Sequence, residues 1–259
     1  DAVFCEGHEL RSVSDAQKCI DRGMHVHLDK PGGTDIAAFE KLLRDADEKG
    51  LTLQMGYMYR YNPAMRYILK SVRDGKLGTI TGIDGSFSIW HDAEKRRWLG
   101  QFPGGMMFYI GCHIIDMIML INGVPLGVTP FNRSSDWDND GSMDSSFAVM
   151  DYPHGICTIR TNATELNGYA RRRLLVVGTK GSIEIQPLEC PTLVRETMLE
   201  NAEGCKCVDA SRSVFPGYLI GRYDGMMLEF AACARGEMRN PYSSEYELAL
   251  QKVLLEACK

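Results

Sequence analysis

The first 60 residues alternate short apolar runs with amphipathic stretches. The runs are typical of buried strands, whereas Ala16, Cys19 and Ile20 repeat at a spacing that favours a helix. Ser14 is a candidate N-cap for this helix, which we expect to end near Gly23. The alternation predicts βαβ units and a parallel sheet. The expected strands are residues 1–5, 25–28 and 51–56, and the expected helices are residues 14–23 and 34–49.

The pattern changes after residue 57, where strand-like segments follow one another. Apolar and polar side chains alternate over residues 80–90, which predicts a strand with one polar face. Turn sequences at residues 151–155 and 178–181 predict hairpins, and hence a largely antiparallel sheet. The further expected strands are residues 127–134, 145–151, 155–165, 171–177 and 182–186; the expected helices are residues 63–74, 218–235 and 243–258 and one that carries His113; residues 189–216 are expected to be irregular.

Composition narrows the class of protein. The 259 residues carry a net charge of -5, which does not favour nucleic acid or an anionic membrane as a main partner. The longest apolar stretch, residues 114–121, contains Asp116 and is far shorter than the ~20 residues of a membrane-spanning helix. No basic and apolar leader opens the chain, so nothing points to export.

The cysteines and histidines do not indicate a metal site. Nine cysteines without paired spacing favour reduced thiols in a cytoplasmic enzyme over a disulfide framework. Cys205 and Cys207 are the one close pair, and no further cysteine or histidine cluster stands near them. His25 and His27 share a strand face, but a third ligand is not within sequence reach. We therefore expect no metal.

Two segments carry candidate chemistry. An acid-lysine-proline turn follows the expected strand 25–28, which places Lys30 at a strand's carboxyl end, where open α/β sheets bind ligands. A glycine-rich turn precedes an apolar helix that carries His113 and Asp116, three positions apart and therefore neighbours on one helix face. Taken singly, such a lysine is more often a solvated turn residue and such a histidine a packed core residue.

Together the two segments resemble the glucose-fructose oxidoreductase and inositol dehydrogenase family, called Gfo/Idh/MocA. In that family the first turn reads Glu-Lys-Pro, and the second motif reads roughly Gly-Gly-Gly-x-x-x-Asp-x-Gly-x-His-x-x-Asp. Tyr109 stands where the family has its first aspartate. The matching residues are Asp29, Lys30 and Pro31 in the first segment, and Gly111, His113 and Asp116 in the second.

The resemblance implies roles for four residues. His113 would accept the proton of a substrate hydroxyl, and Lys30 would hydrogen-bond the reacting oxygen close to a nicotinamide. A neutral phenol stabilises an imidazolium less well than a carboxylate does. Tyr109 therefore either acts as a hydrogen-bonding acid, or marks a site that has changed its substrate or lost its catalytic rate. Asp116 either fixes the ring of His113 or satisfies a polar spot at the domain boundary.

Further residues are implied as binding residues, each with a structural alternative. For Arg60 the alternative is a surface or interdomain salt bridge, and for Trp98 it is core packing. The expected cofactor contacts are Asp29, Lys30, Pro31 and Arg60, and the expected substrate contacts are Trp98 and Asn62. His91 and the consecutive arginines Arg171, Arg172 and Arg173 are lesser candidates; the arginines fit a strand with exposed charge, or a phosphorylated substrate.

We expect an α/β part followed by an α+β part. By resemblance, residues 1–61 are the C-terminal part of a dinucleotide-binding domain of the Rossmann type. Residues 62–259 form a substrate-binding and oligomerisation domain, with a large, mainly antiparallel sheet flanked by helices. The Gly-x-Gly-x-x-Gly sequence of dinucleotide-binding folds does not occur in the chain. A fragment, an upstream segment without fixed structure, and a natural protein without that half of the fold would each explain this.

Three functions follow from the resemblance. The first is an NAD- or NADP-dependent oxidoreductase that acts on a sugar, an inositol or a related polyol, as a homodimer or homotetramer formed through the antiparallel sheet. The second is a glycosidase of the same fold that uses the nicotinamide transiently. The third is a catalytically impaired binding or assembly protein. The sequence does not decide the substrate, the reaction direction, or NAD against NADP.

Overall fold

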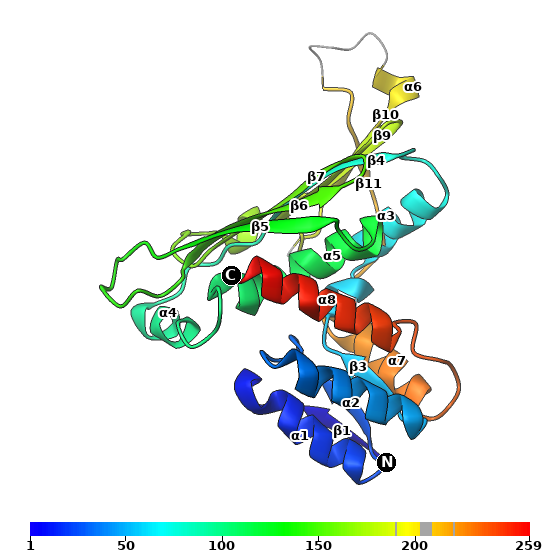
Figure 1. Cartoon of the computed structure of the whole chain (residues 1–259). Helices are drawn as coiled ribbons and strands as arrows, with labels where there is room; N and C mark the ends of the chain where they lie inside the picture. The colour runs from blue at the N-terminus through cyan, green and yellow to red at the C-terminus, as the bar shows by residue number, and fades with distance from the viewer. Residues whose placement is uncertain (190, 203–208, 220) are drawn as a thin grey trace.

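The computed structural model describes residues 1–189, 191–202, 209–219 and 221–259. Figure 1 shows a small sheet with α1 and α2 at one end of the molecule, and a large sheet at the other end, with α7 and α8 between them. Cys205 and Cys207 lie outside the described residues. No described helix has both the length and the apolar character that crossing a membrane requires.

The small sheet is parallel, as the alternation predicts. Its strands β1 (Ala2–Cys5), β2 (His25–Leu28) and β3 (Leu53–Met55) lie in this order, and α1 (Glu9–Asp21) and α2 (Ile36–Glu48) connect them. The N-cap predicted for α1 is wrong: the side chain of His8 caps the helix, and Ser14 lies inside it, where its hydroxyl donates to the carbonyl of Arg11. Serine forms this local bond as readily as a cap.

The large sheet has eight strands in the order β11-β10-β9-β8-β4-β7-β6-β5. Every neighbouring pair is antiparallel except β4 and β7, which confirms the mainly antiparallel sheet. The strands are β4 (Ile80–Ser86), β5 (Gly127–Arg133), β6 (Ser145–Tyr152), β7 (Gly155–Asn162), β8 (Arg173–Gly178), β9 (Gly181–Ile185), β10 (Val194–Met198) and β11 (Arg212–Val214). β4 ends earlier than expected. The residues that follow it still lie beside β7, because the backbone N–H groups of Phe87, Ile89 and His91 donate to carbonyls of β7 and of the residue after it.

The prediction that residues 189–216 are irregular is wrong. β10, the short helix α6 (Leu199–Ala202) and β11 lie within this range. The pattern of β10 is concealed because Glu196, a charged residue, occupies one of its buried positions and pairs there with Arg212 and Tyr67. The sequence also gave no expectation of α4 (Ala93–Leu99), and α7 (Asp224–Ala234) is shorter than expected.

Helices cover one face of the large sheet. Figure 1 shows α3 (Pro63–Arg73), α5 (Cys112–Asn122) and α8 (Ser244–Ala257) on this face. α5 is buried almost completely, and β4 approaches it so closely that a Cβ at Gly85 would lie 2.2 Å from Cγ2 of Ile114. Glycine at this position therefore fixes the height of α5 above the sheet.

The last two helices join the sheets. α8 contacts α2, and the side chain of Gln251 accepts a hydrogen bond from Gly32 N and donates one to Gly33 O. Phe230 of α7 packs edge-on against Phe4, with the ring centroids 5.3 Å apart. The C-terminal segment thus packs against the turn that follows Lys30.

Candidate active site

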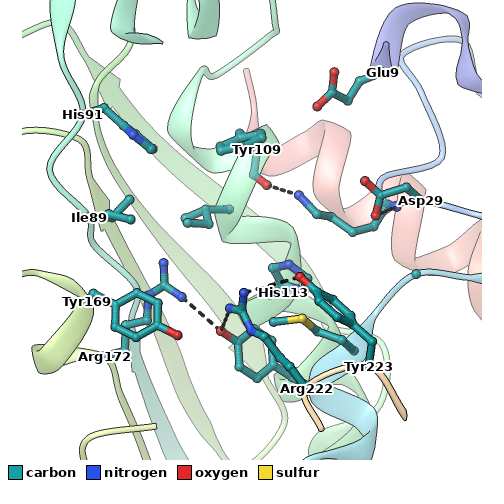
Figure 2. Close-up of a pocket in the computed structure, with 15 residues that line it drawn as sticks. Glu9, Asp29, Ile89, His91, Tyr109, His113, Tyr169, Arg172, Arg222 and Tyr223 are labelled. Carbon is teal, nitrogen blue, oxygen red and sulfur yellow. Dashed lines mark hydrogen bonds between the residues drawn. The ribbon is translucent and has the colours of Figure 1, made fainter. Parts of the chain in front are cut away.

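A cleft of about 320 Å³ lies where the two sheets meet. Asp29, Lys30 and Gly56 line it from the carboxyl ends of β2 and β3, and His113 lines it from α5. Figure 2 shows Tyr109 and His91 at one side of the cleft and Arg172 and Arg222 at the other. The structure therefore brings together the two residues that the motifs single out, Lys30 and His113.

Lys30 enters the cleft directly after β2. Its Nζ donates a 2.7 Å hydrogen bond to the backbone carbonyl oxygen of Tyr109 and lies 4.6 Å from the centroid of the Tyr109 ring. The Asp29 carboxylate accepts from the backbone N–H of Lys30. A Cβ at Gly56 would lie 2.9 Å from that carboxylate, so glycine lets the end of β3 pass close to the turn. Pro31 is buried and does not line the cleft.

His113 is a buried imidazole with aromatic neighbours. Its ring is 5.0 Å from that of Tyr59 and 5.9 Å from that of Tyr57, both edge-on. Burial, reinforced by the positive charges of Lys30 and Arg172, holds the pKa of His113 well below its usual range. The ring is therefore neutral at physiological pH and can accept a proton.

The Nδ1 atom of His113 is buried and has no hydrogen-bond partner among the described residues. In the Gfo/Idh/MocA pattern an aspartate four positions earlier accompanies the histidine, and one helical turn brings such positions together. Here that position is Tyr109. With Tyr109 in place of the aspartate, Nδ1 of His113 has no carboxylate partner from this position.

Tyr109 lies in a π-helical turn, η2 (Met107–Gly111), that leads into α5. Such turns widen the helix locally and are frequent at functional sites. The ring of Tyr109 packs edge-on against Trp98, 5.3 Å away, and Nζ of Lys95 lies 4.5 Å from its centroid. Its carbonyl, not its phenol, binds Lys30.

Arg60 and Asp116 lie together outside the cleft lining. The guanidinium of Arg60 donates to both carboxylate oxygens of Asp116, at 2.8–3.1 Å, and to both of Glu247, at 2.6 and 3.0 Å. All three side chains are at most 2% exposed. Burial holds the pKa of Glu247 above its usual value despite the attraction of Arg60. This arrangement matches the alternatives stated for both residues, an interdomain ion pair and a satisfied polar spot.

The two expected substrate contacts also lie outside the cleft lining. Asn62 is buried, and its side chain caps α3 by accepting from the N–H of Ala64 at 2.8 Å. Trp98 packs against Phe102 and Tyr109, while Nζ of Lys95 lies 3.3 Å from its ring centroid. Trp98 therefore packs against the ring of Tyr109, which lines the cleft, without lining it itself.

Tyr59 and Arg222 line the cleft and Glu189 joins them, although the sequence pattern indicates none of the three. Arg222 donates to both oxygens of Glu189, at 2.8 and 3.0 Å, and the phenol of Tyr59 donates to the same carboxylate. These contacts hold the pKa of Glu189 below its usual value although its burial opposes this. No motif contains the three residues, which are far apart in the chain, so no local signal indicates them.

Only one of the three consecutive arginines lines the cleft. Arg172 is 4% exposed and donates to the phenol of Tyr59 at 3.0 Å. Arg171 pairs with Glu165 at the surface, and Arg173 pairs with Glu184 on the next strand. His91 also lines the cleft, and its buried Nε2 is unpaired within the described ranges.

Metal-ligating side chains do not cluster among the described residues. Nδ1 of His25 accepts a hydrogen bond from the backbone N–H of Thr52, and Nδ1 of His27 pairs with the side chain of Gln54. Both histidines therefore serve the packing of the small sheet.

Residues 65–184 match the family model described as the GFO/IDH/MocA C-terminal domain, which confirms the resemblance. The chain is 29% identical over 136 residues to an NADP(+) scyllo-inositol 2-dehydrogenase of Bacillus subtilis; the match covers 52% of this chain and 38% of the relative. It is 23% identical over 213 residues to a trans-1,2-dihydrobenzene-1,2-diol dehydrogenase of Mus musculus, with 79% of this chain and 57% of the relative covered. The matches thus span between about a third and three-fifths of these relatives.

The fold has counterparts among solved structures. An aldose-aldose oxidoreductase from Caulobacter crescentus, complexed with glycerol, superimposes with a TM-score of 0.84 at 18% identity, over 100% of this chain and 77% of that one. At this identity the similarity establishes the fold, and it confirms the predicted fold class.

Proposed function

We propose that this chain, whose residues 65–184 form a GFO/IDH/MocA C-terminal domain, belongs to an NAD(P)-dependent oxidoreductase that acts on a sugar, an inositol or a related polyol. The observation that carries the proposal is the meeting of Lys30 and His113 at one cleft, at the carboxyl end of a parallel strand. The similarity to a scyllo-inositol 2-dehydrogenase and to a trans-1,2-dihydrobenzene-1,2-diol dehydrogenase supports it.

His113 is the proton acceptor in this proposal. A secondary alcohol loses a proton from oxygen and a hydride from carbon when it is oxidised, so a neutral base must face the hydroxyl. Burial and neighbouring positive charges favour the neutral imidazole. In the reverse direction the protonated ring returns the proton to the oxygen.

Lys30 orients the reacting oxygen. Its amine is fixed by the carbonyl of Tyr109, which uses one of its three protons and leaves the others for a substrate oxygen. The charge of Lys30 also stabilises the alkoxide that develops as the proton leaves.

A nicotinamide ring would bind at the end of β2, because ligands of open α/β sheets bind at the carboxyl ends of the strands. Glycine at position 56 leaves room for the Asp29–Lys30 turn at this end of the cleft, because a Cβ there would lie 2.9 Å from the Asp29 carboxylate. Asp29 and Lys30 are the residues that would contact the cofactor. When bound, the nicotinamide accepts the hydride; NAD and NADP are both compatible with these residues.

The test is nicotinamide reduction by the full-length protein with a panel of sugars, inositols and related polyols. A His113→Ala variant should lose about 100-fold or more in kcat, in line with the loss of a general base. Lys30→Met should lose a comparable factor. The matched controls are His154→Ala and Lys41→Met, which replace an exposed histidine and an exposed lysine.

Two results would overturn the proposal. One is unchanged turnover in the His113→Ala variant. The other is an absence of binding in titrations of the full-length protein with NAD(H) and NADP(H). Release of an aryl glycoside's leaving group without net NADH would instead indicate the redox-assisted glycosidase.

A further inference from the structure

Two guanidinium groups share one carboxylate at the side of the cleft opposite Tyr109. Arg222 binds both oxygens of Glu189, and Arg172 reaches only one of them, with 3.5 Å between Nη1 and Oε1. Hydrogen bonds from Tyr59 and Arg222 hold the pKa of Glu189 below its usual value although burial opposes this, so the carboxylate is ionised. The three side chains therefore carry one net positive charge.

Tyr59 does not neutralise this charge. Its phenol oxygen accepts from Arg172 at 3.0 Å and from Arg222 at 3.2 Å, and it donates to Glu189. Burial holds the pKa of Tyr59 above its usual value, so the phenol stays protonated. Tyr59 positions the two arginines without adding a negative charge.

Arg172, which lines the cleft, has one donor without an acceptor among the described residues. The residue is nine-tenths or more buried, and its Nε lacks an acceptor in the part of the chain that the structure describes. The guanidinium carbon lies 4.3 Å from the ring centroid of Tyr169 and 4.7 Å from that of Phe87, so both rings pack against it. A buried donor without a partner is costly, so a guanidinium group with one unpaired N–H favours binding of an anion.

Glu189 pairs with the arginines and does not line the cleft; among the described residues, Glu9 and Asp29 are the acidic residues that line it. Figure 2 shows Glu9 and Asp29 at the opposite end of the cleft from Arg172. An anion beside Arg172 would therefore meet the positive charge of Arg172 and Arg222, both of which line the cleft.

We infer that the substrate is an acidic sugar or polyol whose oxyanion group, a carboxylate or a phosphate ester, binds to Arg172 while its hydroxyl faces His113 and Lys30. This inference rests on the proposed function and names the substrate class. The cleft volume of about 320 Å³ is at the small end of ligand sites, which suits a monosaccharide better than a larger conjugate.

The test is calorimetric titration of the full-length protein with acids and their neutral parents. The pairs are D-glucuronate with D-glucose, D-galacturonate with D-galactose, and D-gluconate with sorbitol; glucose 6-phosphate is added to separate phosphate from carboxylate. At least one acid should bind about 10- to 100-fold more tightly than its neutral parent, as expected for hydrogen bonds to a charged group. Arg172→Met should abolish the difference.

Arg171→Met is the matched control, because it removes the neighbouring arginine at the surface and should keep the preference. Arg222→Met provides a second variant if Arg172→Met does not fold; it frees Glu189 to pair with Arg172 and should weaken acid binding about 10-fold or more. Equal affinity for acids and neutral parents, or a preference that survives Arg172→Met, would overturn the inference.

Failure of this inference and failure of the proposed function give different results. If nicotinamide reduction with neutral polyols is efficient and depends on His113, the oxidoreductase proposal stands while the acidic-substrate inference fails. If acids bind through Arg172 and no nicotinamide binds, the oxidoreductase proposal fails, while Arg172 is still an acid-binding residue.

Discussion

The amine of Lys30 donates a 2.7 Å hydrogen bond to the backbone carbonyl of Tyr109, a residue 79 positions further along the chain. Because the acceptor belongs to the main chain, this contact does not depend on which side chain position 109 carries. It therefore joins the end of β2 to the turn before α5 and fixes Lys30 near His113, even though Tyr109 replaces the aspartate of the Gfo/Idh/MocA pattern.

Replacing Tyr109 separates the two interpretations of this position. Tyr109→Asp places a carboxylate one helical turn before His113 and offers the unpaired Nδ1 a partner. We expect the pKa of His113 to rise by about one unit or more, since a nearby negative charge favours the imidazolium. NMR titration of the imidazole resonances of His113 measures this pKa in the wild type and in the variant.

Tyr109→Phe is the control for the same experiment. It keeps the ring contacts with Lys30 and Trp98 and the carbonyl acceptor, and we expect kcat within about threefold of the wild type. A loss of about 100-fold would show instead that the phenol acts as an acid.

The pKa of His113 also makes stability depend on pH. Because its folded-state pKa lies below 6.5, the unfolded chain binds more protons as the pH falls through this range, and the free energy of unfolding decreases. Between about pH 7.5 and about pH 5.5 we expect His113 to account for roughly 1 kcal/mol of this decrease. Urea denaturation of the wild type and of His113→Gln measures the difference.

His27 and His91, whose pKa values burial also lowers, contribute to the decrease in both proteins and cancel in the comparison. An identical pH dependence in wild type and His113→Gln would contradict the assignment of a neutral, buried His113.

Arg60 is expected to stabilise the fold and not to bind the cofactor. Arg60→Met leaves the carboxylates of Asp116 and Glu247 buried without their partner, which should cost about 3–5 kcal/mol of unfolding free energy. Arg73→Met, at an exposed position of α3, should change it by less than about 0.5 kcal/mol. A stable Arg60→Met variant that has lost nicotinamide affinity would instead support the cofactor contact that the sequence predicts.

The uncovered face of the large sheet should form the subunit interface. Phe131 of β5 and Phe147 of β6 stand directly opposite one another, with ring centroids 6.3 Å apart, and both are exposed. Figure 1 shows the helices α3, α5 and α8 on the other face. Phe147→Glu should convert a dimer or tetramer to a monomer in light scattering, and Leu166→Glu, on an exposed loop, should not. A monomeric wild type would contradict this prediction.

The sequence predicted the elements whose pattern is local. Hairpin turns, alternating positions and the Pro63 helix start gave most strands and helices, because each depends on neighbouring residues. Prediction was wrong where one charged residue concealed the pattern, as Glu196 does in β10. The N-cap of α1 was wrong because a serine can bond inside a helix as well as at its start.

For the site, the sequence by itself determined that a lysine follows a parallel strand and that a histidine opens an apolar helix, since both facts are properties of short segments. Only the tertiary structure decided which side chains meet. Arg60 reaches Glu247 across 187 positions, and Arg172 meets Tyr59 across 113, because burial leaves a charged or polar group no partner except the one that packing supplies. Such pairs have no spacing that a sequence can display.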